Sequence, residues 1–256
     1  MPEKFIGDVE IVNSNDKRVF VLSPDWNALV LSNDVGNDTV WIHGDVKNGG
    51  SGIELRDKDG KTSFILDAEN NALVLCSKNG AHTVWIHGDV NNGGSGIDFR
   101  DQDGNHTMTL NGESGDIILP TADCAEDFTV LEIQAAEPGT VMVIDSEGGL
   151  RQSTKPYDKK VAGIISGAGN LKPGMVMDRQ PSQHDRMPIS LMGKAYCKVD
   201  AQYSPIEVGD LLTTSLTPGH AMKATDPLKA FGAVIGKALS PLDKGQELIP
   251  ILIALQ

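Results

Sequence analysis

The chain has 256 residues, of which 39% are hydrophobic and 22% are charged. A chain of this length has room for one or two domains with cores of their own. Its 35 acidic and 22 basic side chains give a formal net charge of −13, which disfavours a nucleic-acid-binding face and polyanionic substrates, because phosphate binding needs clustered lysine and arginine.

The N-terminal residues Met1–Lys4 are followed by no long apolar segment, so we expect no secretory signal peptide. No apolar run reaches the roughly 20 residues of a membrane-spanning helix. We therefore expect synthesis in a cytoplasm and no membrane insertion. If the protein works outside a cell, we expect it to leave by lysis or as part of a virion or another extracellular particle.

An eight-residue segment occurs twice without change. Thr39–Val46 reads TVWIHGDV, and Thr83–Val90 is identical, so Trp41 and Trp85 lie 44 residues apart. The glycine-rich loops that follow also repeat. A fixed offset indicates a repeat architecture, and repeats of this kind build rods and surfaces more often than active sites.

Each 44-residue repeat consists of two half-units marked by apolar pairs at i and i+2. This spacing is typical of a strand and places both side chains on one face. The first pairs of the half-units are Val9/Ile11, Leu29/Leu31, Ile53/Leu55, Leu73/Leu75, Ile97/Phe99 and Ile117/Leu119. The second pairs are Phe20/Leu22, Val40/Ile42, Phe64/Leu66, Val84/Ile86 and Met108/Leu110. The pattern predicts five strand–turn–strand units over residues 9–110.

Glycine recurs in four of the predicted turns, at Gly36, Gly60, Gly80 and Gly104. Glycine there supplies the positive φ of a tight turn. The units also differ in character, because Glu54 and Asp98 separate apolar residues whereas Val30 and Val74 continue an apolar run. We expect the carboxylates of Glu54 and Asp98 to be exposed.

Hairpins with two apolar faces need partners on both sides, because a single hairpin is marginal in water. We therefore expect self-association as a homotrimer about an axis along the rod, with a β-helix or monomeric β-solenoid as the alternative. The inward residues should be buried, namely Val40, Ile42, Val84 and Ile86.

Leu119-Pro120 ends the repeat, since proline blocks further strand pairing. Residues 120–128 are predicted to be a short acidic linker, and residues 129–256 a compact β domain punctuated by Pro-Gly and Gly-Asp pairs. Residues 137–166 align without gaps on 207–236, at an offset of 70. The sequence predicts an all-β protein with a repetitive β-hairpin shaft over 5–119. Its β head is expected to be a β-barrel or β-clip-like domain with a pseudo-two-fold duplication.

Two kinds of metal site can be considered in the shaft. In a trimer, His43 and His87 would each form a ring of three imidazoles, but both fall on the face opposite the inward pairs and are better explained as strand-end residues. The Asp57–Gly60 and Asp101–Gly104 segments resemble the start of a calcium loop. They lack the distal glutamate that such a loop needs, so we expect hairpin turns and no metal or cofactor.

The sequence offers no diagnostic nucleophilic site. The polar residues considered are Ser166, Lys155, Asp158, His184, Asp185 and His220. Their spacing assigns no catalytic residue, because triads are recognised by geometry. Trp41 and Trp85 could form a sugar-stacking ladder, although packing explains them more simply. Three widely spaced cysteines, Cys76, Cys124 and Cys197, predict neither a disulfide framework nor a metal cluster.

Five ordered motifs in the C-terminal half resemble a known domain. They are Val161–Gly167, Gly193–Ala201, Gly209–Leu212, Thr217–Ala224 and Val234–Leu239. Together they look like the β domain at the C-terminus of phage tail fibres, neck appendages and related bacterial surface proteins. This domain is similar to the autoproteolytic intramolecular-chaperone family, and the resemblance covers about residues 120–256. It implies a trimeric fibre protein whose C-terminal domain assists assembly.

We therefore expect a structural fibre or spike protein of a phage tail or a contractile-injection-like particle. The head nucleates the trimer, attaches to a target surface, or does both. Expected partners are other copies of the chain, a particle baseplate protein, and a cell-surface glycan or receptor. The alternatives are a self-cleaving intramolecular chaperone and a glycan-binding or glycan-degrading tailspike.

Overall fold

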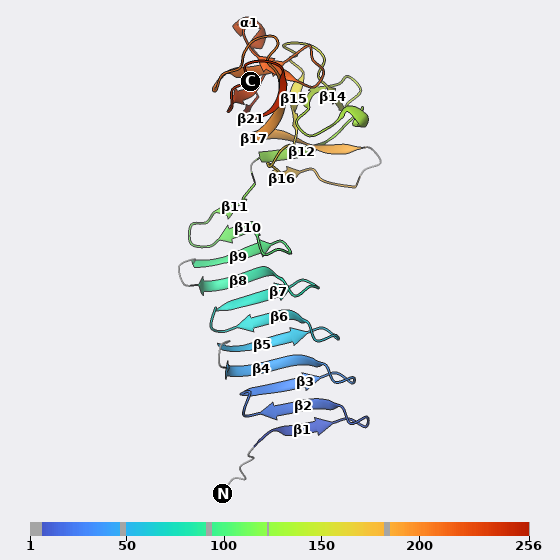
Figure 1. Cartoon of the computed structure of the whole chain (residues 1–256), viewed down its shortest axis with the longest axis vertical. Coiled ribbons are helices and arrows are strands. Elements are labelled where there is room, and N and C mark those ends of the chain that lie inside the picture. The colour runs from blue at the N-terminus through green and yellow to red at the C-terminus, as the bar shows by residue number, and fades with distance from the viewer. Residues whose placement is uncertain (1–6, 47–49, 91–93, 122, 182–184, 256) are drawn as a thin grey trace. The chain divides into compact units, whose positions relative to one another are not determined.

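The computed structural model describes residues 7–46, 50–90, 94–121, 123–181 and 185–255 (Figure 1). Of the described residues, 53% lie in strands and 3% in helices, so the chain is almost all β and the predicted fold class is confirmed. It divides into two compact units, Met1–Pro120 and Thr121–Gln256. Among the described residues, no helix is long and apolar enough to cross a membrane.

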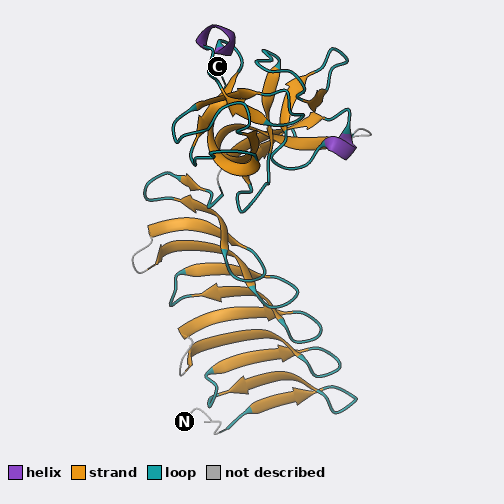
Figure 2. Cartoon of the chain, turned by 45° about the horizontal axis from the view of Figure 1, so that its top comes forward, coloured by secondary structure: helices purple, strands orange, loops and turns teal. Residues whose placement is uncertain are grey.

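The first unit is one antiparallel sheet in which every strand pairs with its neighbours in the sequence (Figures 1 and 2). Its strands are β1 (Val9–Val12), β2 (Arg18–Ser23), β3 (Ala28–Ser32), β4 (Asp38–Val46), β5 (Gly50–Arg56), β6 (Thr62–Asp67), β7 (Ala72–Cys76), β8 (His82–Val90), β9 (Gly94–Arg100), β10 (His106–Asn111) and β11 (Ile117–Ile118). The predicted hairpins are therefore confirmed. The β-helix alternative is wrong for the described sheet, because a solenoid needs coils that wind back into parallel pairing.

The tight turns follow from local chemistry. Gly36, Gly60, Gly80 and Gly104 have φ between +82° and +95°, where a side chain would be strained. In the Asp57 turn, Oδ1 of Asp57 accepts hydrogen bonds from the backbone N–H groups of Asp59 and Lys61, both at 2.9 Å. These side-chain bonds fix the turn and thereby the register of the flanking strands.

One side of the sheet, here called the apolar face, carries two unbroken rows of apolar side chains. The register aligns Val9, Leu22, Leu29, Ile42, Ile53, Leu66, Leu73, Ile86, Ile97, Leu110 and Ile117 in one row. It aligns Ile11, Phe20, Leu31, Val40, Leu55, Phe64, Leu75, Val84, Phe99 and Met108 in the other. The strand period of two predicted this arrangement.

The expected burial of this face is wrong for a single chain. Ile42 and Ile86 are 45% and 43% exposed, and Val40 and Val84 are only half-buried. The residues that are buried in the sheet, such as Val30 at 0% exposure, lie on the opposite side. On that opposite side, here called the polar face, large side chains such as Trp41 pack over small apolar ones. On the apolar face of one chain, no layer of described residues covers the side chains.

The described residues of the second unit form ten strands and two single-turn helices. They are β12 (Asp123–Thr129), η1 (Ile133–Ala135), β13 (Val141–Ile144), β14 (Leu150–Gln152), β15 (Val161–Ile165), β16 (Pro173–Met177), β17 (Arg186–Asp200), β18 (Leu211–Thr214), β19 (Ala221–Lys223), α1 (Pro227–Ala230), β20 (Val234–Ala238) and β21 (Gln246–Ala254). Pairing runs β17-β19-β18-β20-β21 and returns to β17, which closes a five-stranded barrel.

The barrel encloses the larger of the two cores of this unit. Cys197, Ile235 and Ile251 are fully buried within it. A second cluster around Met142, Ile165 and Ile189 lies where β13 and β15 meet β17. Two separate apolar clusters let the unit hold its own structure, as expected for a domain of this size.

The predicted linker 120–128 is wrong over most of its length. Strand β12 begins at Asp123 and pairs with β16 and β17. Its side chains alternate in burial, with Asp123, Ala125 and Asp127 buried. The acidic residues suggested a solvated segment, but both buried carboxylates accept hydrogen bonds from the head.

The predicted duplication is visible in the pairing, with a three-residue correction. Strand β13 pairs with β14 and β15, and β18 pairs in the same way with β19 and β20. Gly163 faces Met142 and Gly236 faces Leu212, each next to a bulge. The equivalent of Gly163 is therefore Gly236, at an offset of 73, because the β18–β19 turn is one residue longer than the β13–β14 turn and the segment containing α1 adds two more residues.

Candidate functional site

The apolar face is an extensive exposed surface on the described strands of the first unit. Eleven strands spaced about 4.8 Å apart span about 50 Å, and two side-chain rows occupy a strip about 13 Å wide. The strip therefore has an area of about 700 Å². Monomeric soluble proteins rarely expose apolar patches above about 300–600 Å², so this face is a candidate interaction surface.

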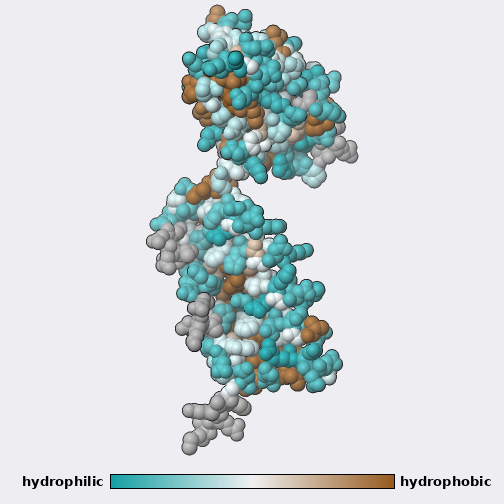
Figure 3. All heavy atoms as spheres, in the orientation of Figure 1, coloured by the Kyte–Doolittle hydropathy of each residue, from teal (hydrophilic) through white to brown (hydrophobic). Residues whose placement is uncertain are grey.

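The polar face repeats a different constellation with the 44-residue period. The Arg56 guanidinium carbon lies 5.0 Å from the centre of the Trp41 ring, and Arg100 lies 5.2 Å from that of Trp85. Arg56 also pairs with Glu54 at 2.8 Å between its guanidinium nitrogen and Oε2. Figure 3 shows a side of this unit on which hydrophilic residues predominate.

These contacts explain why the carboxylates are not exposed as expected. The side chains of Glu54 and Asp98 are 25% and 14% exposed, so that expectation is wrong. Glu54 lies opposite Trp41, and Asp98 lies opposite Trp85, in the register of the sheet. The large indoles and the neighbouring arginines cover the carboxylates and compensate their charge.

His43 and His87 have the same environment in the two repeats. Nδ1 of His43 lies 3.1 Å from the Gly50 carbonyl oxygen, and the equivalent distance from His87 to Gly94 is 2.9 Å. Nε2 lies 4.0 Å from Oε1 of Glu54 in the first case and 3.6 Å from Oδ2 of Asp98 in the second. Each imidazole thus links its strand at two points to the next strand, which begins at Gly50 or Gly94.

This geometry disfavours the metal hypotheses. Among the described residues, no group of three histidine, cysteine or acidic side chains is placed to hold a metal ion. Asp57 and Asp101 already accept turn hydrogen bonds. A backbone hydrogen bond from Lys61 lowers the pKa of Asp57, and bonds from Asn105 lower that of Asp101. These segments are hairpin turns.

Trp41 and Trp85 pack against other side chains instead of presenting free ring faces. Trp26 stacks on Trp41, with ring centroids 5.6 Å apart and an interplanar angle of 26°. His82 lies 5.6 Å from Trp85 in a tilted arrangement. With an arginine beside each ring as well, the geometry favours packing over a sugar-stacking ladder.

Ser166 is part of a buried polar cluster in the head. Its hydroxyl donates a hydrogen bond of 2.8 Å to Oδ2 of Asp123, and Ser190 donates to the same oxygen. Ser166 and Asp123 are each 5% exposed. The cluster connects β12 to β15 and β17, which is a structural role that sequence spacing did not indicate.

The other polar candidates lie in separate local contacts. Oδ1 of Asp158 accepts from the Lys160 backbone, and Nδ1 of His220 lies 2.8 Å from the Pro218 carbonyl oxygen. Lys155 is exposed, and the carbonyl group of Asp185 accepts from Val130 N–H. His184 lies outside the described residues. Among those described, none of these groups joins Ser166.

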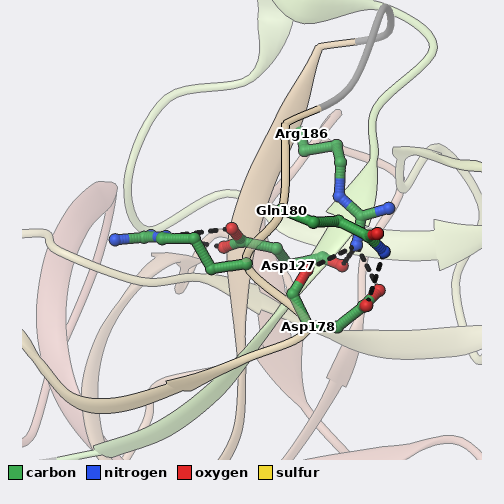
Figure 4. A network of polar contacts seen from close by, with 5 residues as sticks. Asp127, Asp178, Gln180 and Arg186 are labelled. Atoms are coloured by element: carbon green, nitrogen blue, oxygen red, sulfur yellow. Dashed lines mark hydrogen bonds and ion pairs between the residues drawn. The ribbon is translucent and has the colours of Figure 1, made fainter.

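An ionic cluster surrounds Asp127 of β12, the first strand of the head (Figure 4). Arg179 donates two hydrogen bonds to the Asp127 carboxylate, at 3.0 and 3.3 Å. Arg186 donates to the Asp127 carbonyl oxygen and to the Asp178 carboxylate, which also accepts from Gln180. The cluster ties β12 to the end of β16 and the start of β17.

Cys76, Cys124 and Cys197 are all free, as expected from their number and spacing. Cys197 is fully buried, and this burial raises the pKa of its thiol to about 12. The reactive form of a cysteine is the thiolate. Cys197 is therefore an inert core residue near neutral pH.

The head contains a cavity that the sequence analysis did not predict. Its volume is about 480 Å³, and it is lined by Pro156, Tyr157, Tyr203, Leu216, Met222, Lys223, Thr225 and Lys229. These residues come from four separated segments of the chain. Only the fold brings them together, and no local spacing could have shown it.

No protein-family model matches the chain, and no curated protein matches it. Among solved structures, the chain is similar to the pre-mature gene product 12 of bacteriophage phi29, with 16% identity and a TM-score of 0.38. The match covers 58% of this chain and 24% of that one. The matched part of this chain thus spans about a quarter of the length of that protein.

Proposed function

We propose that the chain is a homotrimeric structural protein of the fibre or spike type, whose apolar face is the contact between copies. The observation that carries the proposal is the pair of unbroken apolar rows along β1–β10, one of which continues onto β11. On the apolar face, Ile42, Leu66 and Ile86 are between 39% and 45% exposed in one chain. Covering such a strip is strongly favourable, at about 25 cal/mol per Å² of apolar surface.

The width of the strip favours three copies. Sheets that pack face to face lie about 10 Å apart, so each contributes about 5 Å of side chain. Three strips about 13 Å wide, set as the sides of a triangular prism, lie about 4 Å from the central axis. Side chains from three sheets would therefore fill the interior without a channel.

The repeat creates a register problem that gives the head a role. Moving one sheet by four strands, about 19 Å, places Phe20 at the position of Phe64 and Ile42 at that of Ile86. A shifted assembly therefore keeps the same apolar contacts as the correct one, except at the end strands that the shift leaves uncovered. A head that associates with its copies would set the register, as weakly specified strands require.

The resemblance of the head to the C-terminal domains of phage tail fibres and neck appendages supports this reading. We assign the protein to a phage tail or a contractile-injection-like particle, with no enzymatic turnover. Its partners would be its own copies, a baseplate protein and a target surface. The acidic composition favours none of the nucleic-acid roles.

Thiol labelling tests whether another chain covers the apolar face. Ile42→Cys and Val35→Cys would be compared in a background with Cys76→Ser and Cys124→Ser, leaving the buried Cys197 in place. Val35 is 62% exposed on a turn, so the thiol of Val35→Cys should react with the labelling reagent about as fast as a free thiol in solution. The Ile42→Cys thiol should react at least about a hundredfold more slowly, and equal rates would contradict the proposal.

A further inference from the structure

The cavity in the head has one aromatic wall that is held unusually firmly. Tyr157 has a backbone φ of +55°, a rare conformation for a bulky residue. Its hydroxyl oxygen accepts backbone N–H groups from Thr225 and Asp226, at 3.0 and 3.1 Å. Its own N–H donates to the Thr214 carbonyl oxygen at 3.2 Å. Such strain persists where the surroundings impose it, often at binding sites.

A second aromatic wall is fixed through a buried carboxylate. Tyr203 is 41% exposed, and its hydroxyl lies 2.9 Å from Oγ1 of Thr217. Thr217 in turn donates at 2.6 Å to Asp200, which is 0% exposed. Tyr203 therefore donates to Thr217, and the chain of bonds fixes its ring before any ligand arrives.

The remaining lining combines apolar surface with a charge-balanced rim. Met222 is 7% exposed, and Leu216 is 60% exposed. At the rim, Nζ of Lys223 lies 2.7 Å from the Asp210 carboxylate. Nζ of Lys229 lies 3.3 Å from the Asp226 carboxylate and 5.9 Å from the Tyr157 ring centre. Each lysine thus has its own counter-ion.

We propose that this cavity binds a neutral sugar ring, such as the terminal residue of a surface glycan. The C–H face of a pyranose carries partial positive charge that complements the negative face of a tyrosine ring. Its hydroxyl groups can bond to Thr225 and to the Lys–Asp pairs at the rim. The inference specifies the ligand of the attachment role proposed above and rests on that role for its biological meaning.

The chemistry of the rim separates this ligand from two others. A phosphate or carboxylate would have to compete with Asp210 and Asp226 for the lysines, in a chain of net charge −13. A wholly apolar ligand would leave the rim groups without new partners. The volume of about 480 Å³ falls within the 300–1,000 Å³ typical of small-molecule sites.

Saturation-transfer difference NMR on the full chain tests the proposal. The probes are the methyl glycosides of glucose, galactose, mannose and N-acetylglucosamine, with N-acetylneuraminic acid as the anionic comparison. We expect transfer to at least one neutral glycoside, with affinity on the order of millimolar. Transfer to the acid alone, or to none of the probes, would overturn the inference.

Three variants place the binding. Tyr203→Ala should weaken it about tenfold, whereas Tyr203→Phe keeps the ring and should retain most of it. Phe231→Ala is the matched control, because Phe231 is 82% exposed and does not line the cavity. Circular dichroism would establish that Tyr203→Ala folds. Equal transfer to folded Tyr203→Ala and to the wild type would exclude this cavity.

The two proposals fail separately. Sugar binding is measured at the head, and oligomeric mass depends on the apolar face. A trimer without sugar transfer would refute this inference and leave the structural proposal in place. A monomer that binds sugar through Tyr203 would refute the trimer and retain the cavity assignment.

Discussion

Replacing Ile86 by aspartate places a charge in the middle of the apolar face. Ile86 lies opposite Leu73 and Ile97 in the register and is 43% exposed in one chain. In an isolated sheet, the substitution would cost about 1–2 kcal/mol, from partial loss of apolar burial and the poor strand propensity of aspartate. The carboxylate would still reach water.

In a trimer the same substitution has a much larger effect. Three carboxylates would meet near the axis, each losing the roughly 1.5–3 kcal/mol of a buried isoleucine and adding several kcal/mol for an unpaired buried charge. The total is more than about 10 kcal/mol per trimer, so Ile86→Asp should abolish assembly or precipitate.

Light scattering and thermal unfolding would separate the two cases. Val35→Asp is the control, because it makes a similar change at a turn residue that is 62% exposed. It should keep the wild-type mass and a Tm within a few degrees. If Ile86→Asp also kept both, the apolar face would not be an interface and the reasoning would be refuted.

Three further outcomes follow from the contacts. Trp85→Ala should destabilise the sheet by about 2–4 kcal/mol in chemical denaturation, because it leaves Arg100 and Asp98 without their packing partner; no change would contradict the packing role. Burial raises the pKa of Asp200, but the hydrogen bonds that its carboxylate accepts, first among them the one from Thr217, lower the pKa by more. The pKa of Asp200 therefore lies below 3.8. This stabilisation is present above pH 3.8 and is lost as the pH falls through the lower folded-state pKa. The Tm should therefore fall less steeply with decreasing pH in Asp200→Asn than in the wild type. Ser166→Ala should leave chain mass and assembly unchanged on a gel and by light scattering, and a longer chain in the variant would reveal self-cleavage.

The sheet was predictable because its information is local. Apolar residues at i and i+2 and glycines at the turns are short-range signals, and the exact repeat of Thr39–Val46 multiplied them. Even the sharing of one face by His43 and Trp41 followed from the strand period. Burial was not predictable in the same way, because Ile42 is 45% exposed in one chain and its proposed cover is another copy, whereas Glu54 is covered by Trp41 from the preceding strand.

The head was less predictable because its contacts join distant segments. The Tyr157 hydroxyl binds the backbone of Thr225 and Asp226 across 68 and 69 residues. The sequence placed Asp123 in a linker, whereas in the structure its carboxylate accepts hydrogen bonds from Ser166 and Ser190. Sequence spacing cannot show which distant groups a fold brings into contact.

The mass of the full chain in solution tests the central proposal most directly. Light scattering across a dilution series from about 100 to 1 μM would give the oligomeric state without any substitution. We predict about 82 kDa at every concentration, which is three times the 27.3 kDa of one chain. A monodisperse species at 27.3 kDa would contradict the assembly of three sheets through their apolar faces.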